Sequence, residues 1–200
     1  MNIPYLYSKI LKKIRGASIL NSEIHESSKV ESGTSFINSK MSKYSFCGYD
    51  CEIMSTEIGS YCSIANNVII GGAMHPLDWV STSPVFYSGR DSVKMKFSTF
   101  DRPKDIVTII NHDVWIGQYC LIKQGVTIGT GAVIGMGSVL TKDVPPYEIW
   151  AGNPAKFIKK RFDEETIEKL LAGKWWNKSD DEMRKLAKKI REVKKFVNEL

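Results

Sequence analysis

Large aliphatic residues return every six positions along two stretches of this 200-residue chain. A helix repeats every 3.6 residues and a strand every two, so neither explains a spacing of six. A three-sided coil does, because each hexapeptide then supplies one short strand and one corner, and three of them close a coil of about 18 residues. The repeat positions are Ile58, Ile64 and Ile70, and then Ile110, Ile116, Ile122, Ile128, Ile134 and Leu140.

This period predicts a mainly β fold, a parallel β-helix over residues 21–160. Each large aliphatic side chain points inward, a small residue follows at the corner, and successive coils stack roughly 4.8 Å apart. Ile24, Val30 and Phe36 keep the spacing before the first stretch, but the register slips over residues 42–51. We therefore expect imperfect coils in that part.

Residues 1–20 predict a short amphipathic helix. Its apolar side chains fall on one stripe, and four basic residues flank them. Such a helix caps the open end of the β-helix or packs on a neighbouring subunit; the alternative is peripheral contact with an anionic membrane. The stripe consists of Ile3, Leu6, Tyr7, Ile10, Leu11 and Ile14.

Residues 161–200 predict a helical tail. Its first helix is expected to start at an N-cap, Asp163, and to stop at Gly173. The second is expected to start with a capping box formed by Ser179 and Glu182 and to continue to the end of the sequence. The expected buried stripe of this second helix is Met183, Leu186, Ile190, Val193 and Val197.

Composition limits the class of protein. An apolar fraction of 42% is enough for a core, and the net charge of +6 sits in short runs that fit solvated surface, an anionic ligand or a membrane, with no nucleic-acid partner expected. We see no signal peptide and no apolar run of membrane-spanning length, and expect a cytoplasmic protein. Its four cysteines form no Cys-x-x-Cys pair and are expected to stay thiols; a zinc site on Cys47 and Cys51 is disfavoured, so no metal is expected.

An insertion at residues 71–107 interrupts the repeat. It opens with "GGAMHPLDWVSTSPVFY", which carries His75, one of three histidines in the chain. A prism with flat faces has no pocket, so a projecting segment is needed to wall a site and to hold a catalytic group there. Taken by itself, a loop histidine is more simply a solvent-exposed residue.

The segments "TKDVPPYEIWAGNPAKFIKKRF" and "KWWN", together with the hexapeptides, resemble the hexapeptide-repeat acyltransferases over about residues 50–178. Within that family the chain is most similar to the branch of xenobiotic (chloramphenicol and streptogramin) acetyltransferases and sugar O-acetyltransferases. The resemblance implies a left-handed parallel β-helix. Handedness comes from the resemblance alone, since general crossover rules favour the right-handed connection.

The resemblance also implies acetyl-CoA as co-substrate, a homotrimer, and a catalytic histidine on the inserted loop at a cleft between two subunits. His75 matches that position. An imidazole changes charge near neutral pH, so it can take the proton of an acceptor hydroxyl and return it to the CoA sulfur. A backbone N–H would stabilise the oxyanion. Asp78 or a backbone carbonyl would orient the imidazole.

Aromatic residues are frequent in the insertion. Trp79 and Tyr87, with Asp78, are candidates to bind the acceptor, because aromatic rings stack on sugars; packing of the loop explains the aromatic residues equally well. His112 precedes a repeat and is expected to be an exposed turn residue. We assign His25 no role.

CoA carries three phosphates and needs an extended groove with positive charge at one end. Matched residue by residue, the resemblance places Gly117 and Met136 near the pantetheine arm, Thr141 and Lys142 nearby, and Lys156 and Lys159 toward the phosphates. The family often has arginine where this chain has the last two lysines, which keep the charge but not bidentate contact. Arg161 is a candidate to supply that contact.

The leading hypothesis is an acetyl-CoA-dependent O-acetyltransferase acting on a sugar of a surface polysaccharide, capsule or lipopolysaccharide. The alternative is a xenobiotic acetyltransferase acting on a drug hydroxyl. A zinc hydrolyase on the same prism needs two histidines five residues apart, and position 117, five after His112, is glycine. A non-catalytic scaffold is disfavoured by the intact His75 and the Val-Pro-Pro segment.

Overall fold

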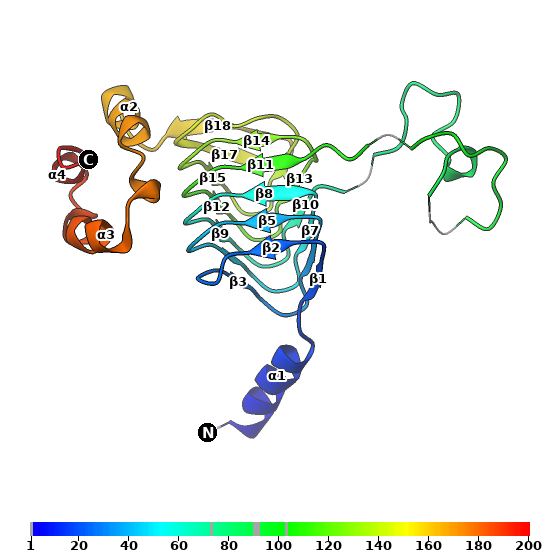
Figure 1. Ribbon diagram of the computed structural model, residues 1–200, viewed down its shortest axis with the longest axis horizontal. Helices are drawn as coiled ribbons and strands as arrows, with labels where there is room; N and C mark the ends of the chain where they lie inside the picture. Colours follow the sequence, from blue (N-terminus) through cyan, green and yellow to red (C-terminus); the bar gives the residue numbers. More distant parts are fainter. Residues whose placement is uncertain (1, 73, 90–92, 103) are drawn as a thin grey trace.

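A computed structural model describes residues 2–72, 74–89, 93–102 and 104–200. The chain winds into stacked coils whose short strands line up in three sheets, which we call A, B and C in the order the chain visits them. Figure 1 shows the coils stacked along one axis, with helix α1 (Ile3–Ile14) beyond the first coil, the helical tail on one side and the insertion projecting from the opposite side. The predicted parallel β-helix is confirmed.

The strands of each sheet come from successive coils. Within the described residues all strand pairs are parallel except β17 and β18, which pair antiparallel at the last coil. Sheet A holds β1 (Ser18–Leu20), β4 (Ser35–Ile37), β7 (Glu52–Met54), β10 (Ile69–Ile70), β13 (Leu121–Ile122) and β16 (Val139–Leu140). Sheet B holds β2 (Glu23–Ile24), β5 (Lys40–Met41), β8 (Thr56–Ile58), β11 (Thr108–Ile110) and β14 (Thr127–Ile128). Sheet C holds β3 (Lys29–Val30), β6 (Phe46–Cys47), β9 (Ser63–Ile64), β12 (Trp115–Ile116), β15 (Val133–Ile134), β17 (Glu148–Gly152) and β18 (Ala155–Lys160).

The core is the stack of inward repeat residues. Ile64, Ile116 and Ile134 lie directly above one another in sheet C, and each is fully buried. The four cysteines are buried among the coils as free thiols, and burial raises the pKa of the Cys62 thiol to about 12. Such thiols behave as small apolar residues rather than as nucleophiles.

The early coils are complete, so the expectation that they are imperfect was wrong. Their strand partners, such as Ser18 with Ser35 and Ser35 with Glu52, lie 17 residues apart, whereas Leu121 and Val139 in the later coils lie 18 apart. The missing residue comes from the corner between sheets A and B. There a single left-handed residue turns the chain, Asn21, Asn38 or Ser55, each with φ close to +50°. The apparent slip is therefore a regular short corner.

The helical tail differs from its prediction in two places. Helix α2 (Glu164–Gly173) has the predicted N-cap, Asp163, but the left-handed residue that ends it is Lys174, with φ of 41°. Gly173 stays inside the helix, where a Cβ would lie 2.6 Å from the Leu200 side chain. The helix thus ends at Gly173 as predicted, but the left-handed turn is made by Lys174, and the glycine makes room for the end of the tail.

The predicted second helix of the tail is broken. Its capping box at Ser179 is confirmed, but the segment divides into α3 (Asp180–Leu186), the 3-10 turn η3 (Ala187–Lys189) and α4 (Val193–Val197). The break lets the chain fold back, so that Phe196 packs on Trp175 with ring centroids 6.4 Å apart. Ile190, expected on the buried stripe, is 53% exposed, and Phe196 is buried in its place.

The tail covers the corner between sheets B and C. Trp175 and Trp176, in the turn η2 (Trp175–Asn177), form its own small core together with Tyr147 from the last coil. Trp176 stacks on His112 with ring centroids 5.1 Å apart and planes 14° from parallel. His112 is half-buried rather than an exposed turn residue, and its Nδ1 accepts a hydrogen bond from the Ser60 N–H.

Candidate active site

The insertion, residues 71–107, forms an arm that leaves the corner between β10 and β11. Gly71 and Gly72 have φ of 86° and 99°, values that favour glycine, and a Cβ at Gly71 would lie 2.3 Å from the Met54 carbonyl oxygen. These two glycines let the chain leave the coil. Arm residues 73, 90–92 and 103 lie outside the described residues.

The far end of the arm is held by its own contacts. The Ser88 N–H donates to the Phe100 carbonyl at 2.7 Å, and the Lys96 ammonium donates to the Pro84 and Tyr87 carbonyls. Tyr87 is 6% exposed and forms the centre of this small folded unit, which also includes the turn η1 (Pro84–Phe86). The arm is therefore a built support for a side chain and not an unstructured linker.

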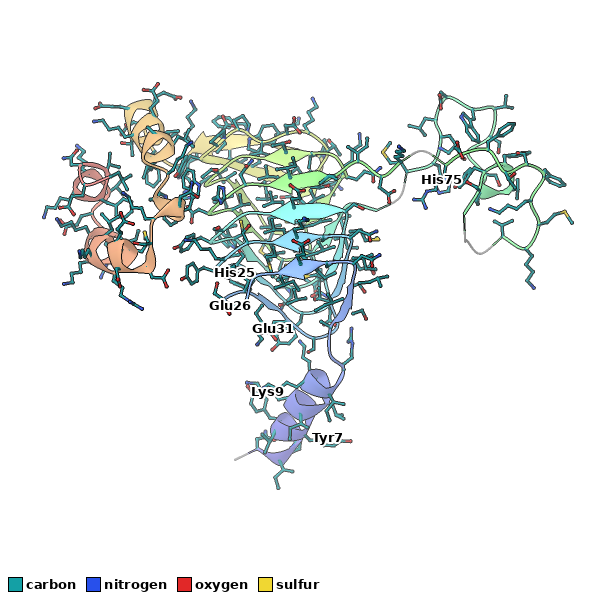
Figure 2. The ribbon with its side chains drawn as sticks, viewed as in Figure 1. Tyr7, Lys9, His25, Glu26, Glu31 and His75 are labelled. Atoms are coloured by element: carbon teal, nitrogen blue, oxygen red, sulfur yellow. The ribbon has the colours of Figure 1, made fainter. Side chains whose placement is uncertain are left out.

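His75 lies in this folded unit of the arm, clear of the coils (Figure 2). Its Nδ1 lies 2.7 Å from the Thr82 carbonyl oxygen and 3.1 Å from the Tyr87 hydroxyl. A carbonyl can only accept, so Nδ1 carries a proton, and in the neutral imidazole the lone pair is then on Nε2. This tautomer presents a proton acceptor at the exposed edge of the ring, as a general base requires.

The group that orients the imidazole is thus a backbone carbonyl, one of the two alternatives considered for that role, and not Asp78. Tyr87 supports the ring from a second direction, with ring centroids 6.2 Å apart in an edge-on arrangement. Together the two contacts hold the imidazole plane, which lowers the entropy lost when a substrate has to meet Nε2.

A hollow of about 770 Å³ lies beside the imidazole support. Trp79 stands edge-on to both Tyr87 and Phe100, with ring centroids 6.2 and 5.8 Å away, so an aromatic chain runs from the histidine into the hollow. Carboxylates stand at its border. Its lining includes Asp78, Trp79, Phe86, Phe100 and Asp101. Of the expected acceptor-binding residues, Asp78 and Trp79 line the hollow and Tyr87 lies buried beneath Trp79.

A second hollow, of about 400 Å³, lies where the arm leaves the coils. Met74 and Ile106 from the two ends of the arm face Thr141 and Lys142 of the last coil, and Lys123 adds a second ammonium. Two of the expected CoA-binding residues are therefore brought to the base of the arm, in a place with apolar walls, two lysines and the Asp143 carboxylate.

Gly117 and Met136 lie at the opposite edge of sheet A, at the corner with sheet C. Met136 is 73% exposed, which leaves a large apolar side chain available for contact. Packing between coils also explains why position 117 is glycine, because a Cβ there would lie 2.5 Å from the Met136 amide nitrogen of the next coil.

Lys156 and Lys159 both lie on β18, where their side chains are exposed. Lys159 pairs with Ile149, which continues the outward row formed by Trp115 and Val133 on sheet C. An apolar row that ends in an ammonium suits a long ligand with a charged end.

Arg161 does not join these lysines. Its guanidinium donates to the Asp113 carboxylate at 3.1 Å and to the Gly131 carbonyl at 2.6 Å, and lies over the Tyr147 ring. Burial raises the pKa of Asp113, and Arg161 opposes that shift. The arginine therefore fastens the tail to the coils, and the idea that it replaces a missing phosphate contact was wrong.

The six expected CoA-binding residues thus occupy both edges of sheet A and the outer face of sheet C, not one pocket. The His75 imidazole makes its hydrogen bonds inside the arm, with Thr82 and Tyr87, and with none of these six residues. Among the described residues, no three His, Cys, Asp or Glu side chains are grouped as a metal site would need.

Three residues that contribute to the candidate site were not predicted from the sequence. Thr82 acts through its backbone carbonyl, which no side-chain pattern reveals. Phe100 and Asp101 complete the hollow from a point more than twenty residues along the chain from His75. The aromatic content of the whole arm, rather than of its first half, was the signal that could have found Phe100.

Comparison with known proteins gives matches over the coils. The family model described as bacterial transferase hexapeptide (six repeats) matches residues 108–142. A probable macrolide acetyltransferase of Lysinibacillus sphaericus is 46% identical, over 63% of this chain and 71% of its own length. A chloramphenicol acetyltransferase of Escherichia coli is also 46% identical, over 60% of this chain; the match spans 58% of that relative's length.

A solved structure of similar fold is that of the polySia specific acetyltransferase NeuO. It is 31% identical, with a TM-score of 0.53, and the match covers 74% of this chain and 70% of that one.

Proposed function

The chain belongs to the hexapeptide-repeat acyltransferase family, and we propose that it is an O-acetyltransferase that moves an acetyl group from acetyl-CoA to a sugar hydroxyl in surface polysaccharide synthesis, capsule or lipopolysaccharide. The observation that carries the proposal is the bond from His75 Nδ1 to the Thr82 carbonyl, which leaves Nε2 as the proton acceptor. We place the reaction in the cytoplasm, where the four thiols stay reduced.

The transfer needs one base and an activated acyl donor. Acetyl-CoA brings the thioester. His75 Nε2 takes the proton of the acceptor hydroxyl as that oxygen bonds to the thioester carbonyl carbon; the C–S bond then breaks, and the imidazolium returns the proton to the departing sulfur. Every atom of the reaction is accounted for by donor, acceptor and one imidazole, so no acyl-enzyme is formed.

The hollow lined by Trp79, which the ring of Tyr87 links to His75, supports a sugar as acceptor. Sugar rings present apolar C–H faces and hydroxyl edges, which match an aromatic wall formed by Trp79 and Phe100 and the acceptor oxygens of Asp78 and Asp101. NeuO, named as specific for polySia, is a relative with such an acceptor.

A drug acceptor is the second candidate, and the names of two relatives favour it. One is a probable macrolide acetyltransferase and the other a chloramphenicol acetyltransferase. The identity of the acceptor is tested by thiol release from acetyl-CoA with chloramphenicol, a macrolide, sugar nucleotides and an oligosaccharide as acceptors. Turnover with a sugar alone supports the first candidate, and rapid turnover with a drug alone overturns it.

The site needs a second copy of the chain, and we propose a homotrimer. His75 sits on an arm that projects from the coils (Figure 2). The expected CoA-binding residues Gly117 and Met136 lie on the coils themselves. The arm also exposes large apolar side chains that another surface would cover, including Ile106 at 55% and Phe97 at 72%. Closed cyclic assembly joins each arm to a neighbour's groove. Sedimentation of a monomer at micromolar concentration would contradict this.

The role of His75 is tested by His75→Ala. Loss of a general base lowers kcat by at least about 100-fold, while sedimentation and circular dichroism stay unchanged. His25→Ala, a change of the same kind at a corner of the first coils, leaves kcat unaltered. Tyr87→Phe keeps the ring and removes the hydroxyl, and we expect a loss below about tenfold because the Thr82 carbonyl still fixes the tautomer. Full activity of His75→Ala removes this histidine from the mechanism.

A further inference from the structure

Helix α1 contacts the coils through its polar side. The Lys12 ammonium lies 3.8 Å above the Tyr49 ring, and Arg15 pairs with Asp50 at 2.6 Å. The Gly33 amide donates to the Gly16 carbonyl just after the helix. These contacts tie the helix to the first coils at its C-terminal end and on its charged face.

The apolar stripe of α1 is left outside. In the described helix no residue is buried, which is the reverse of the usual arrangement in which an amphipathic helix buries its apolar face. A helix that caps the prism would cover these side chains, so the capping expectation was wrong for the single chain. Exposed fractions are 77% for Ile3, 44% for Leu6, 63% for Tyr7, 48% for Ile10, 49% for Leu11 and 73% for Ile14.

The charge around this stripe has one sign. Residues 1–22 contain Lys9, Lys12, Lys13 and Arg15 and no acidic residue, the first being Glu23. On a helical wheel Lys13 borders the stripe on one side, where its long stem can lie along an apolar surface while the charge reaches outward. Arg15 borders the other side, but its charge is paired with Asp50 of the coils. Apolar stripe and cationic border together are the pattern of a helix that lies in the interface of an anionic bilayer.

A bundle of α1 helices from several copies is the competing occupant. The helix has 12 residues, so a heptad seam would run for less than two heptads, well below the three or four that specify a coiled coil. Such a bundle would also gather cations from every copy with no acid on the helix to offset them. The charge pattern favours an anionic lipid surface over a second copy.

We propose that α1 holds the protein at an anionic membrane surface by inserting this stripe among the lipid headgroups. The helix projects beyond the first coil and away from the last coils, so it forms one end of the molecule (Figure 1). Within the part of the chain that the structure describes, no helix is long and apolar enough to cross a bilayer. Contact of this kind would keep the enzyme beside lipid-linked acceptors.

The test is flotation of the full chain with lipid vesicles. We expect it to float with phosphatidylcholine vesicles that contain about one-third phosphatidylglycerol and to remain unbound with phosphatidylcholine alone. Lys9→Gln with Lys13→Gln should weaken partitioning about thirty-fold. Lys185→Gln with Lys188→Gln removes the same charge from the exposed side of the tail and should leave partitioning unchanged.

The stripe is tested separately from the charge. Ile10→Asn with Leu11→Asn should weaken partitioning at least about tenfold. Tyr5→Asn, a change to the same residue on the opposite side of α1, should not. Acetyl transfer to a soluble acceptor should be equal in all these variants, which keeps a failure of this proposal distinct from a failure of the proposed function.

Two outcomes would overturn the proposal. One is a wild-type chain that stays unbound with anionic vesicles. The other is an Ile10→Asn, Leu11→Asn variant that floats as the wild type does but sediments as a smaller species, because the stripe would then cover a second copy of the chain.

Discussion

Replacing Gly131 with alanine tests how tightly the helical tail is held on the coils. Gly131 has φ of 72°, and a Cβ there would lie 2.4 Å from a carbon of the Tyr147 ring, which is 1% exposed. Gly137 has nearly the same conformation, φ of 69°, but nothing lies within 4 Å of its Cβ position. The two glycines therefore carry equal backbone strain when substituted and differ in the space around the new methyl group.

The magnitudes follow from these two terms. Left-handed backbone costs alanine about 1 kcal/mol, which is the whole expected loss of unfolding free energy for Gly137→Ala. Overlap with a buried ring adds about 1–3 kcal/mol, so Gly131→Ala should cost about 2–4 kcal/mol. The ring cannot move freely, because Arg161 and Phe162 pack against it.

Urea unfolding followed by circular dichroism gives both free energies, and tryptophan fluorescence reports on Trp175 in the core of the tail. Gly131→Ala should shift the fluorescence at low urea, and Gly137→Ala should not. Equal costs for the two variants would refute the reasoning, because the tail would then be too loosely held for the overlap to matter.

Three further outcomes are expected. Burial lowers the pKa of His112, whose Nδ1 accepts a hydrogen bond from the Ser60 N–H. Because the unfolded chain binds the proton more readily, the contribution of His112 to stability is complete above about pH 6.5 and is lost as the pH falls toward the pKa of the folded state. The urea midpoints at pH 8 and pH 5 should therefore differ less in His112→Gln than in the wild type. Ile110→Ala, at an inward position that is 1% exposed, should lower the free energy of unfolding by about 2–5 kcal/mol in the urea assay. Ile109→Ala, at the neighbouring position that is 39% exposed, should lower it by less than about 1 kcal/mol. Lys159→Ala should raise the KM for acetyl-CoA about tenfold with little change in kcat, and acetyl-pantetheine, which lacks the distal phosphates, should show no difference between the two proteins.

The early coils show how much a repeat pattern can specify. From Ile24 the inward residues follow spacings of six, six and five. This repeat is as regular in the sequence as the later spacing of six. The five-residue step was interpreted as a slip because one exact period was assumed. A left-handed residue does not distinguish the short corners, because six-residue corners have one too, such as Tyr44 and Asp50. The recurrence of the five-residue step was the signal that would have corrected the interpretation.

The arm shows the opposite limit. Its place and its histidine were predictable, since an insertion stands out against a regular repeat. The partner of His75 was not, because the Thr82 carbonyl is a backbone group that every residue possesses, and only the fold of the arm brings it to Nδ1.

By itself, the sequence determined the three-sided coil, its inward residues and the point where the arm leaves it. Contacts between neighbouring coils repeat at a fixed spacing along the chain, so the order of apolar and small residues in the sequence reflects them directly. Only the tertiary structure decided the rest. Arg161 turns to Asp113, His112 stacks on Trp176, the last helix breaks so that Phe196 can reach Trp175, and α1 keeps its apolar side outward. Each of these depends on packing between segments with no shared period, where the gain in burial or in charge pairing is known only once both surfaces are in place.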